Sequence, residues 1–321
     1  MFGYTVFHQD IMRSLIDSVR SGKNASSYIF EGQRDLAVNE AAELFAKSLM
    51  CLEQGAAPCG ECGPCKAFET GADLDLTYVR RPKDKATIGV DTAREVVKAA
   101  MVKPLYSTRR VFIFDEGDKL TPEAQNALLK ILEEPPEYAV FVIVCTNGDN
   151  ILQTVRSRSI TIEFPPVSDD IVRDYIEKKY PDDPRVDFLV SFCAGIPMAA
   201  DNILAREDFE ALREDTLNIL PRFLSKNKVY AYDAAEFFEK NKDNAAELCD
   251  MLLLYLRDAL VISVCGGDIV NIDKAEKISM IASSYTPSVI TAAADEMIML
   301  KKMLQKHIKP AAAALHAALK I

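Results

Sequence analysis

Runs of consecutive apolar residues alternate with helix-like segments through the first half of this chain. A strand that is apolar on both faces needs cover on both faces, so this alternation is typical of a parallel sheet between helices. The expected strands are residues 28–30, 76–79, 111–114, 139–145 and 160–164. Apolar spacing predicts helices over 11–19, 39–52 and 90–102, and a further helix that Thr121 caps and Pro135 stops. We therefore expect an α/β domain.

The double proline Pro165-Pro166 marks a boundary, because only helical patterns follow it. The expected helices are 169–180, 186–193, 198–204, 209–225, 230–241, 243–264, 272–284 and 286–308. A chain of 321 residues is too long for one typical domain. We expect an α/β domain over 1–165, a small helical domain over 166–207 and an all-α domain over 208–321.

Composition limits the function classes that fit this chain. The net charge of −10 argues against a broad DNA-gripping surface, since such surfaces use Lys and Arg to neutralise phosphates. No apolar stretch reaches the roughly 18 residues of a membrane span, and residues 1–10 do not resemble a signal peptide, so a soluble cytoplasmic protein is expected. His8, His307 and His316 are dispersed and suggest surface positions and no catalytic or metal site.

Four cysteines lie close together in the sequence and suggest a metal site. They are Cys51, Cys59, Cys62 and Cys65. Four thiolates complete a tetrahedral shell around Zn²⁺ and leave no open position for a catalytic water, so a structural zinc is predicted. Glycines such as Gly55 and Gly60, with the prolines between the cysteines, let the chain turn around a metal. The alternative is a group of four reduced thiols without metal, which would be an oxidation liability.

The remaining cysteines lie far apart in apolar surroundings. We expect them to be buried small hydrophobic residues. They are Cys145, Cys193, Cys249 and Cys265.

A nucleotide-binding loop is expected where the strand over 28–30 leads into the next helix, but the residues that it needs are missing. A phosphate loop of the form G-x-x-x-x-G-K-[ST] uses backbone N–H groups and a Lys to hold phosphates and a hydroxyl to hold Mg²⁺. Counting from Gly32, Ala37 replaces the second glycine, Val38 the Lys and Asn39 the Ser/Thr. Asp35 adds a negative charge. We therefore expect no productive ATP binding.

An acidic pair follows the strand over 111–114. Asp115 and Glu116 resemble a Walker B element, in which the Asp helps to hold Mg²⁺ and the Glu orients the attacking water. The alternative is an ordinary solvated strand end. Without a phosphate loop, these carboxylates are expected to be a remnant or to form structural hydrogen bonds.

Several segments in order resemble one family. They are Tyr28 to Gly32, the four-cysteine loop over 51–65, Arg109 to Asp115, the run A-L-L-K-I-L-E-E-P-P over 127–136, Cys145 to Asn147, and Ser157-Arg158-Ser159. This series resembles the bacterial DNA polymerase III clamp-loader family of AAA+ proteins. The resemblance covers about residues 5–205, and the C-terminal third matches only in length and helical character.

The resemblance implies an architecture and partners. Family members have a RecA-like AAA+ domain, a small helical lid and a helical collar, which would correspond to 1–165, 166–207 and 208–321. They form a hetero-pentameric ring that places the sliding clamp on primed DNA. The gamma/tau subunits keep the phosphate loop, whereas delta-prime subunits often have a degraded one and serve as a stator beside gamma/tau and delta. The degraded loop here favours the delta-prime type.

The resemblance also implies a role for one arginine. Ser157-Arg158-Ser159 corresponds to the S-R-C motif of the family, whose Arg projects into a neighbouring subunit's ATP site as an arginine finger. Such a guanidinium offsets charge on the transferred phosphoryl group and raises the rate by orders of magnitude. Ser159 departs from the motif, Arg156 lies close enough to compete for the assignment, and a salt bridge is the alternative for Arg158.

Two further positions bear on ATP hydrolysis. Met198 stands where active members carry a sensor Arg, and Thr146 matches a polar sensor that would be idle here. An active ATPase of the same family is the main alternative, which Val38, Asn39 and Met198 oppose. An unrelated zinc-dependent DNA-binding module is opposed by the acidic composition. A basic group near the C-terminus is expected to be a solvated helix face, with contact to DNA or a neighbour as the alternative: Lys301, Lys302, Lys306 and Lys309.

Overall fold

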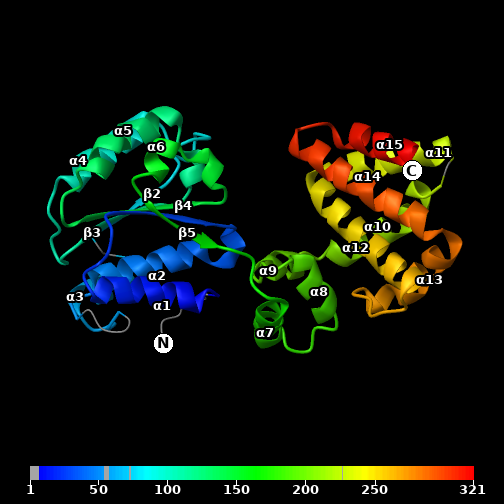
Figure 1. Ribbon diagram of the computed structural model, residues 1–321, viewed down its shortest axis with the longest axis horizontal. Helices are drawn as coiled ribbons and strands as arrows, with labels where there is room; N and C mark the ends of the chain where they lie inside the picture. The colour runs from blue at the N-terminus through cyan, green and yellow to red at the C-terminus, as the bar shows by residue number, and fades with distance from the viewer. Residues whose placement is uncertain (1–6, 54–57, 72–73, 226) are drawn as a thin grey trace. The chain divides into compact units, whose positions relative to one another are not determined.

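The computed structural model describes residues 7–53, 58–71, 74–225 and 227–321 (Figure 1). Of the sequence-based expectations, Gly55 and the first six residues of the segment compared with a signal peptide lie outside the described residues. The chain divides into two compact units, 1–167 and 168–321. The finer division at 207 stays a prediction.

The first unit contains a five-stranded sheet in the order β2-β3-β4-β1-β5, and every strand pair is parallel. The strands are β1 (Ser27–Gly32), β2 (Leu76–Val79), β3 (Arg110–Phe114), β4 (Ala139–Cys145) and β5 (Ile160–Phe164). All seven residues of the central strand β4 are buried, as expected for a strand covered on both faces. The predicted parallel sheet is confirmed.

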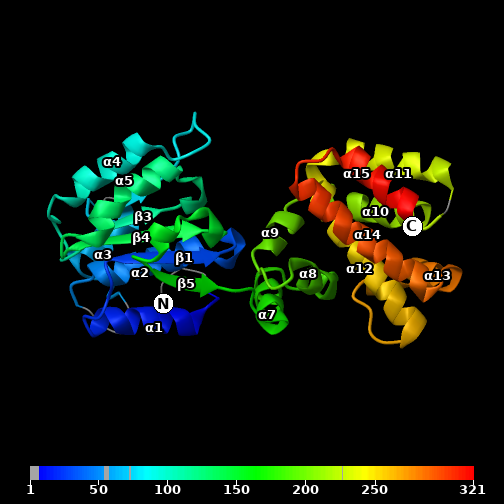
Figure 2. The same ribbon diagram turned by 45° about the horizontal axis from the view of Figure 1, so that its top comes forward.

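Helices cover both faces of this sheet (Figures 1 and 2). One face carries α1 (Gln9–Arg20), α2 (Val38–Met50) and α3 (Gly63–Thr70), and the other α4 (Val90–Ala100), α5 (Pro122–Glu133) and the short α6 (Gln153–Arg156). The Thr121 side chain accepts a hydrogen bond from the Ala124 N–H, so α5 starts with the expected cap. Helix α3 was not predicted, because the glycines and prolines of the cysteine loop indicated only turns.

Apolar side chains fill both interfaces between sheet and helices. Phe112 and Phe141 stack with ring centroids 5.3 Å apart on the side of α4 and α5. Phe30 lies between Phe45 of α2 and Phe164 of β5 on the opposite side. These aromatic contacts fix the sheet against its helices, and the strand ends that follow them carry the candidate site residues.

Every regular element of the described residues in the second unit is helical. The α-helices are α7 (Asp169–Lys179), α8 (Val186–Cys193), α9 (Ala199–Leu204), α10 (Phe209–Phe223), α11 (Lys228–Lys240), α12 (Ala245–Val264), α13 (Ala275–Ser284), α14 (Pro287–Gln305) and α15 (Pro310–Lys320). The predicted helical C-terminal region is confirmed, except that α15 was missed. Its alanine-rich sequence offers no contrast between an apolar and a polar face, although Ala313 and Ala317 are buried.

One sequence-based expectation needs correction, and two residues expected at the surface have partners there. Cys265 is exposed rather than buried, because α12 ends there and the chain turns away at Gly266, whose φ is +59°. His8 is half-buried, with Nε2 2.7 Å from the Pro165 carbonyl oxygen. Lys301 forms an ion pair with Asp250, so it is only partly solvated.

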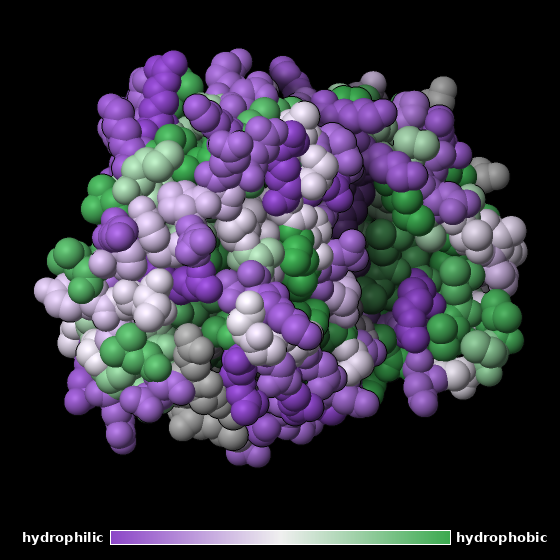
Figure 3. All heavy atoms as spheres, turned by 60° about the vertical axis from the view of Figure 1, so that its left-hand side comes forward, coloured by the Kyte–Doolittle hydropathy of each residue, from purple (hydrophilic) through white to green (hydrophobic). Residues whose placement is uncertain are grey.

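The surface agrees with the charged composition of the chain. Hydrophilic side chains cover much of the face in Figure 3, with hydrophobic residues in groups between them. Among the described helices, none combines the length and the apolar character that crossing a membrane requires.

Candidate functional site

Buried apolar side chains lie in the loop between β1 and α2, where the sequence predicts a degraded phosphate loop. Strand β1 ends at Gly32, a 3-10 turn spans Arg34–Leu36, and α2 begins at Val38. Ala37 has a φ of +58°, a left-handed conformation that glycine adopts at lower cost. Ala37 is 1% exposed and Val38 is 0% exposed. The chain therefore runs from strand through loop to helix, with buried apolar side chains at the last loop residue and the first helix residue.

Gly32 itself is in close contact with β5. A Cβ atom at this position would lie 2.8 Å from the Cβ atom of Phe164 and 3.0 Å from Cγ2 of Val38. The glycine is therefore required for close packing of β1 against its neighbours, not for space around a ligand.

Negative charge surrounds the first turn of α2. Burial raises the pKa of Glu40, and the nearby carboxylates of Glu43, Asp115 and Asp35 raise it further. A helix N-terminus normally attracts anions. Here several carboxylates lie near the helix N-terminus, of which Asp115 is paired with Arg80.

The acidic pair at the end of β3 holds arginines. Asp115 Oδ2 lies 2.9 Å from Nε of Arg80. Glu116 lies between two guanidinium groups, with Oε1 3.2 Å from Arg34 and Oε2 3.4 Å from Arg81. In this arrangement the two carboxylates connect the ends of β2 and β3 to the 3-10 turn after β1.

The two candidate sensor residues, Thr146 and Met198, lie in different parts of the chain. The Thr146 hydroxyl donates to Oδ2 of Asp118 at 2.9 Å, and the Thr146 N–H donates to the same oxygen at 2.8 Å. Met198 is the residue before α9 in the second unit and is half-buried. Its thioether carries no charge that could meet a phosphate.

Arg158 follows α6 and is held within its own chain. Its Nε donates to Oε1 of Glu133 at 2.8 Å, and Nη2 donates to the same oxygen. Nη1 donates to the Thr154 carbonyl oxygen at 2.7 Å and to the Ser157 hydroxyl at 3.3 Å. The side chain is 32% exposed. Sequence reasoning considered a salt bridge for this residue but did not identify Glu133 as the partner.

The other residues of the triplet region lie in different surroundings. Arg156 Nη1 is 3.6 Å from Asp149 Oδ1. The Ser159 hydroxyl is 2.7 Å from the Ser27 hydroxyl of β1 and donates to the Val155 carbonyl oxygen. Ser159 therefore attaches the end of α6 to the sheet, and Arg158 is the residue of the triplet whose side chain reaches a carboxylate.

The four cysteines of the loop converge at the C-terminal end of α2. The sulfur atoms of Cys51, Cys59, Cys62 and Cys65 all lie within 4.8 Å of one another. Cys59 and Cys65 have their sulfur atoms 4.0 Å apart. Around a tetrahedral Zn²⁺ with Zn–S bonds of about 2.3 Å, the sulfur atoms would be about 3.8 Å apart. The geometry fits such a metal.

Backbone amides prepare one of these sulfurs for a metal. The N–H groups of Cys62 and Glu61 donate to Sγ of Cys59 at 3.3 and 3.4 Å. These bonds, that from Cys62 first, lower the pKa of the Cys59 thiol to about 7. Burial raises the pKa of Cys65. A thiolate is the form that binds zinc, and Gly60, with a φ of +74°, forms the turn that directs these amides.

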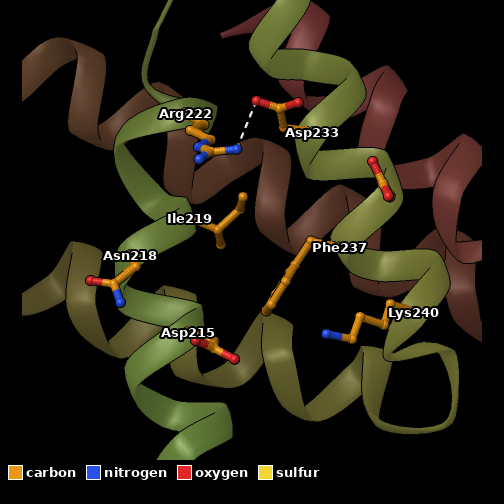
Figure 4. Close-up of a pocket in the computed structure, with 8 residues that line it drawn as sticks. Asp215, Asn218, Ile219, Arg222, Asp233, Phe237 and Lys240 are labelled. Carbon is orange, nitrogen blue, oxygen red and sulfur yellow. Dashed lines mark hydrogen bonds and ion pairs between the residues drawn. The ribbon is translucent and has the colours of Figure 1, made fainter.

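A surface pocket in the second unit offers a contrast with these sites. It has a volume of about 340 Å³ and lies between α10 and α11 (Figure 4). Ile219 and Phe237 point into it, and Arg222 forms an ion pair with Asp233 at 2.7 Å. The lining residues contain no cysteine or histidine, and this pair satisfies its own charges. The pocket shows no arrangement for chemistry.

Two models of one protein family match successive parts of the chain. The family described as "DNA polymerase III, delta subunit" matches residues 7–168, and "DNA polymerase III, delta subunit, C terminal" matches residues 207–311. DNA polymerase III subunit delta' of Bacillus subtilis is 28% identical over 303 residues, which cover 93% of this chain and 91% of that protein.

Two further proteins match. DNA polymerase III subunit tau/gamma of Haemophilus influenzae is 32% identical over 177 residues, which cover 54% of this chain but only 25% of that protein. The crystal structure of a DNA polymerase III gamma subunit-related protein from Thermotoga maritima has a TM-score of 0.48 and 19% identity. That match covers 96% of this chain and 97% of the other.

Proposed function

We propose that this chain, which belongs to the family of DNA polymerase III delta subunits and resembles its delta-prime members, is the stator of a bacterial clamp loader. In this role it hydrolyses no ATP. It joins gamma/tau and delta subunits in a hetero-pentameric ring in the cytoplasm, and this ring places the sliding clamp on primed DNA. Residues 1–165 are the AAA+ domain, residues 166–207 the lid and residues 208–321 the collar.

The loop between β1 and α2, with its buried apolar side chains, is the observation that carries this proposal. Phosphate would have to displace the fully buried Val38, and no Lys or hydroxyl is present to bind phosphate or Mg²⁺. Glu116 pairs with Arg34 and Arg81, so a Mg²⁺ ion would have to displace two guanidinium groups as well. Each lost contact that is worth about 1.4 kcal/mol weakens binding tenfold.

Calorimetry of the isolated chain with Mg²⁺ and ATP tests this part of the proposal. We expect no binding at millimolar ATP, while a gamma/tau subunit with an intact loop binds under the same conditions. Micromolar binding would contradict the stator role and would favour the alternative, an active ATPase of the same family.

Arg158 is the residue that we propose to act on a neighbour. Its guanidinium would exchange the carboxylate of Glu133 for the phosphoryl group of ATP bound to the adjacent subunit. Because the Glu133–Arg158 contact is partly exposed to solvent, an ion pair of this kind contributes only about 0–1 kcal/mol. A phosphoryl group that carries more charge can therefore displace it.

The ATPase activity of the assembled complex tests this assignment. We expect Arg158→Ala to lower hydrolysis at the adjacent site by about 10³-fold or more, the size of effect known for arginine fingers. Arg156→Ala is the matched control, since Arg156 ends α6 and pairs weakly with Asp149. Unchanged activity for Arg158→Ala, or an equal loss for both variants, would contradict the assignment.

We also propose that the four cysteines hold a structural zinc. They would supply all four ligands, so the metal would stabilise the loop over 51–65 and would activate no water. The convergence of the sulfurs and the N–H bonds to Cys59 support this proposal.

A further inference from the structure

A buried lysine connects α2, which Cys51 follows, to α3, which contains Cys65. Lys47 of α2 is 2% exposed, and its Nζ donates to Oε1 of Glu69 on α3 at 2.9 Å. The same ammonium lies 5.5 Å from the centre of the Phe68 ring. Lysine is rarely buried to this extent, so its position in this interface requires an explanation.

Helical spacing places this contact one turn from the cysteines on each helix. Cys51 follows Lys47 by four residues, and the Cys51 N–H donates to the Lys47 carbonyl oxygen at 3.0 Å. Glu69 follows Cys65 by four residues on α3. Four residues advance a helix by about 6 Å and return to the same face. Cys51 and Cys65 thus lie one helical turn from Lys47 and Glu69, which form the ion pair.

We propose that Lys47 is a positioning residue for metal binding, which sets the spacing and orientation of α2 and α3 so that the sulfurs of Cys51 and Cys65 meet at one point. This inference rests on the proposed zinc site. Cys51 and Cys65 are the two buried cysteines of the four; Cys51 directly follows the last residue of α2, and Cys65 lies within α3. Their separation therefore depends on how the helices pack, whereas Cys59 lies in the loop between them and Cys62 immediately precedes α3.

Charge gives the lysine a second reason to lie here. Four thiolates around one Zn²⁺ carry a net negative charge, and the C-terminal end of α2 adds the negative end of its dipole. The Lys47 ammonium in the last turn of α2 opposes both. An apolar residue would fill the same space without this effect. The lysine half of the contact is buried between the helices, and the Glu69 side chain is 56% exposed.

Zinc affinity of the full chain, measured by competition with a chromogenic chelator, tests the inference. We expect Lys47→Met to weaken zinc binding about tenfold or more, a change of about 1.4 kcal/mol. Lys66→Met is the matched control, because Lys66 is exposed on α3 beside Cys65, and it is expected to leave the affinity within about twofold. Lys47→Arg keeps the charge and is expected to restore most of the affinity.

A second measurement separates positioning from general stability. In the cobalt(II)-loaded chain, the visible bands report the symmetry of the four-sulfur site, and we expect Lys47→Met to shift them while Lys66→Met does not. Wild-type affinity and bands in Lys47→Met would overturn the inference and leave the zinc site standing. Equal loss of stability in the metal-free and metal-loaded variant, with no rescue by Lys47→Arg, would also overturn it. A wild-type chain that takes up no zinc would overturn the site and the inference together.

Discussion

The two ends of α2 differ in what they leave open for a ligand. At the N-terminal end, where we propose a degraded phosphate loop, the residues Leu36, Ala37 and Val38 are apolar and buried. At the C-terminal end, Cys51 meets three other thiols, and the four sulfurs all lie within 4.8 Å of one another. One helix thus begins at a site without its ligand groups and ends at a site with a complete set.

Electrostatics explains why the two ends have different requirements. A helix N-terminus favours an anion, yet its partial charge is small and needs a Lys, free N–H groups and space beside it. A helix C-terminus disfavours thiolates, so a sulfur cluster there gains from a cation. The comparison shows that backbone geometry alone does not make a ligand site. The converging side chains decide it.

The largest effect is expected from loss of metal at the C-terminal end. Cys62→Ser should reduce zinc from one ion per chain to almost none and lower the free energy of unfolding by about 3 kcal/mol or more, because structural zinc contributes folding free energy. Metal analysis and thermal unfolding measure both. Cys265→Ser, at an exposed position, is the control. If the purified wild-type chain contained no zinc, neither end of α2 would bind a ligand, and the comparison would fail.

Rebuilding the phosphate loop should fail at the N-terminal end. The triple change Ala37→Gly, Val38→Lys and Asn39→Thr places an ammonium at a fully buried position. We expect the free energy of unfolding to fall by about 3–5 kcal/mol, the cost of a buried charge without a partner, and calorimetry to detect no ATP binding. Asn39→Thr alone serves as the control. Micromolar ATP binding by a stable triple variant would show that this end retains a phosphate site.

Adding a methyl group near each end of α2 tests how tightly each end is packed. Gly32→Ala brings a Cβ atom to 2.8 Å from Phe164, so we expect a loss of about 1–3 kcal/mol in denaturant unfolding. Gly63→Ala, beside the cysteines, meets no atom within 4 Å, and a change within about 0.5 kcal/mol is expected. Equal effects would mean that the loop before α2 is not tightly packed.

The smallest effect concerns the acidic pair. Glu116→Gln removes one charge from the contacts with Arg34 and Arg81, and we expect a loss of less than about 1 kcal/mol, since both arginines are partly exposed. ATP binding by the isolated chain should stay undetectable. If ATP binding appeared in this variant, the carboxylate would be the group that excludes nucleotide, and the filled loop would matter less than proposed.

Local patterns in the sequence predicted the parts of the fold that local forces decide. The apolar run over 139–145 became the buried central strand, and Thr121 with the proline after it started α5. The sheet order was not predictable, because it depends on pairing between distant strands. Cys265 was misjudged because its apolar neighbours suggested burial, although the end of a helix leaves it exposed.

The candidate site shows the same division. The missing Lys at Val38 and the grouping of the cysteines are visible in the sequence. The Arg158–Glu133 contact joins residues 25 positions apart, and the Lys47–Glu69 contact joins residues 22 positions apart. No periodicity links such pairs, since tertiary packing brings them together. Sequence reasoning therefore identified candidate ligands but missed the residues that hold them.

Arg158 donates hydrogen bonds to the carboxylate of Glu133, so any other anion that binds Arg158 must displace this carboxylate. In the isolated chain, Glu133 is the carboxylate that binds Arg158. In the proposed ring, the phosphates of a neighbour's ATP would compete with Glu133, and their charge would depend on which nucleotide is bound and how far hydrolysis has gone. The arginine would then report the state of the neighbouring subunit to a chain that binds no nucleotide of its own.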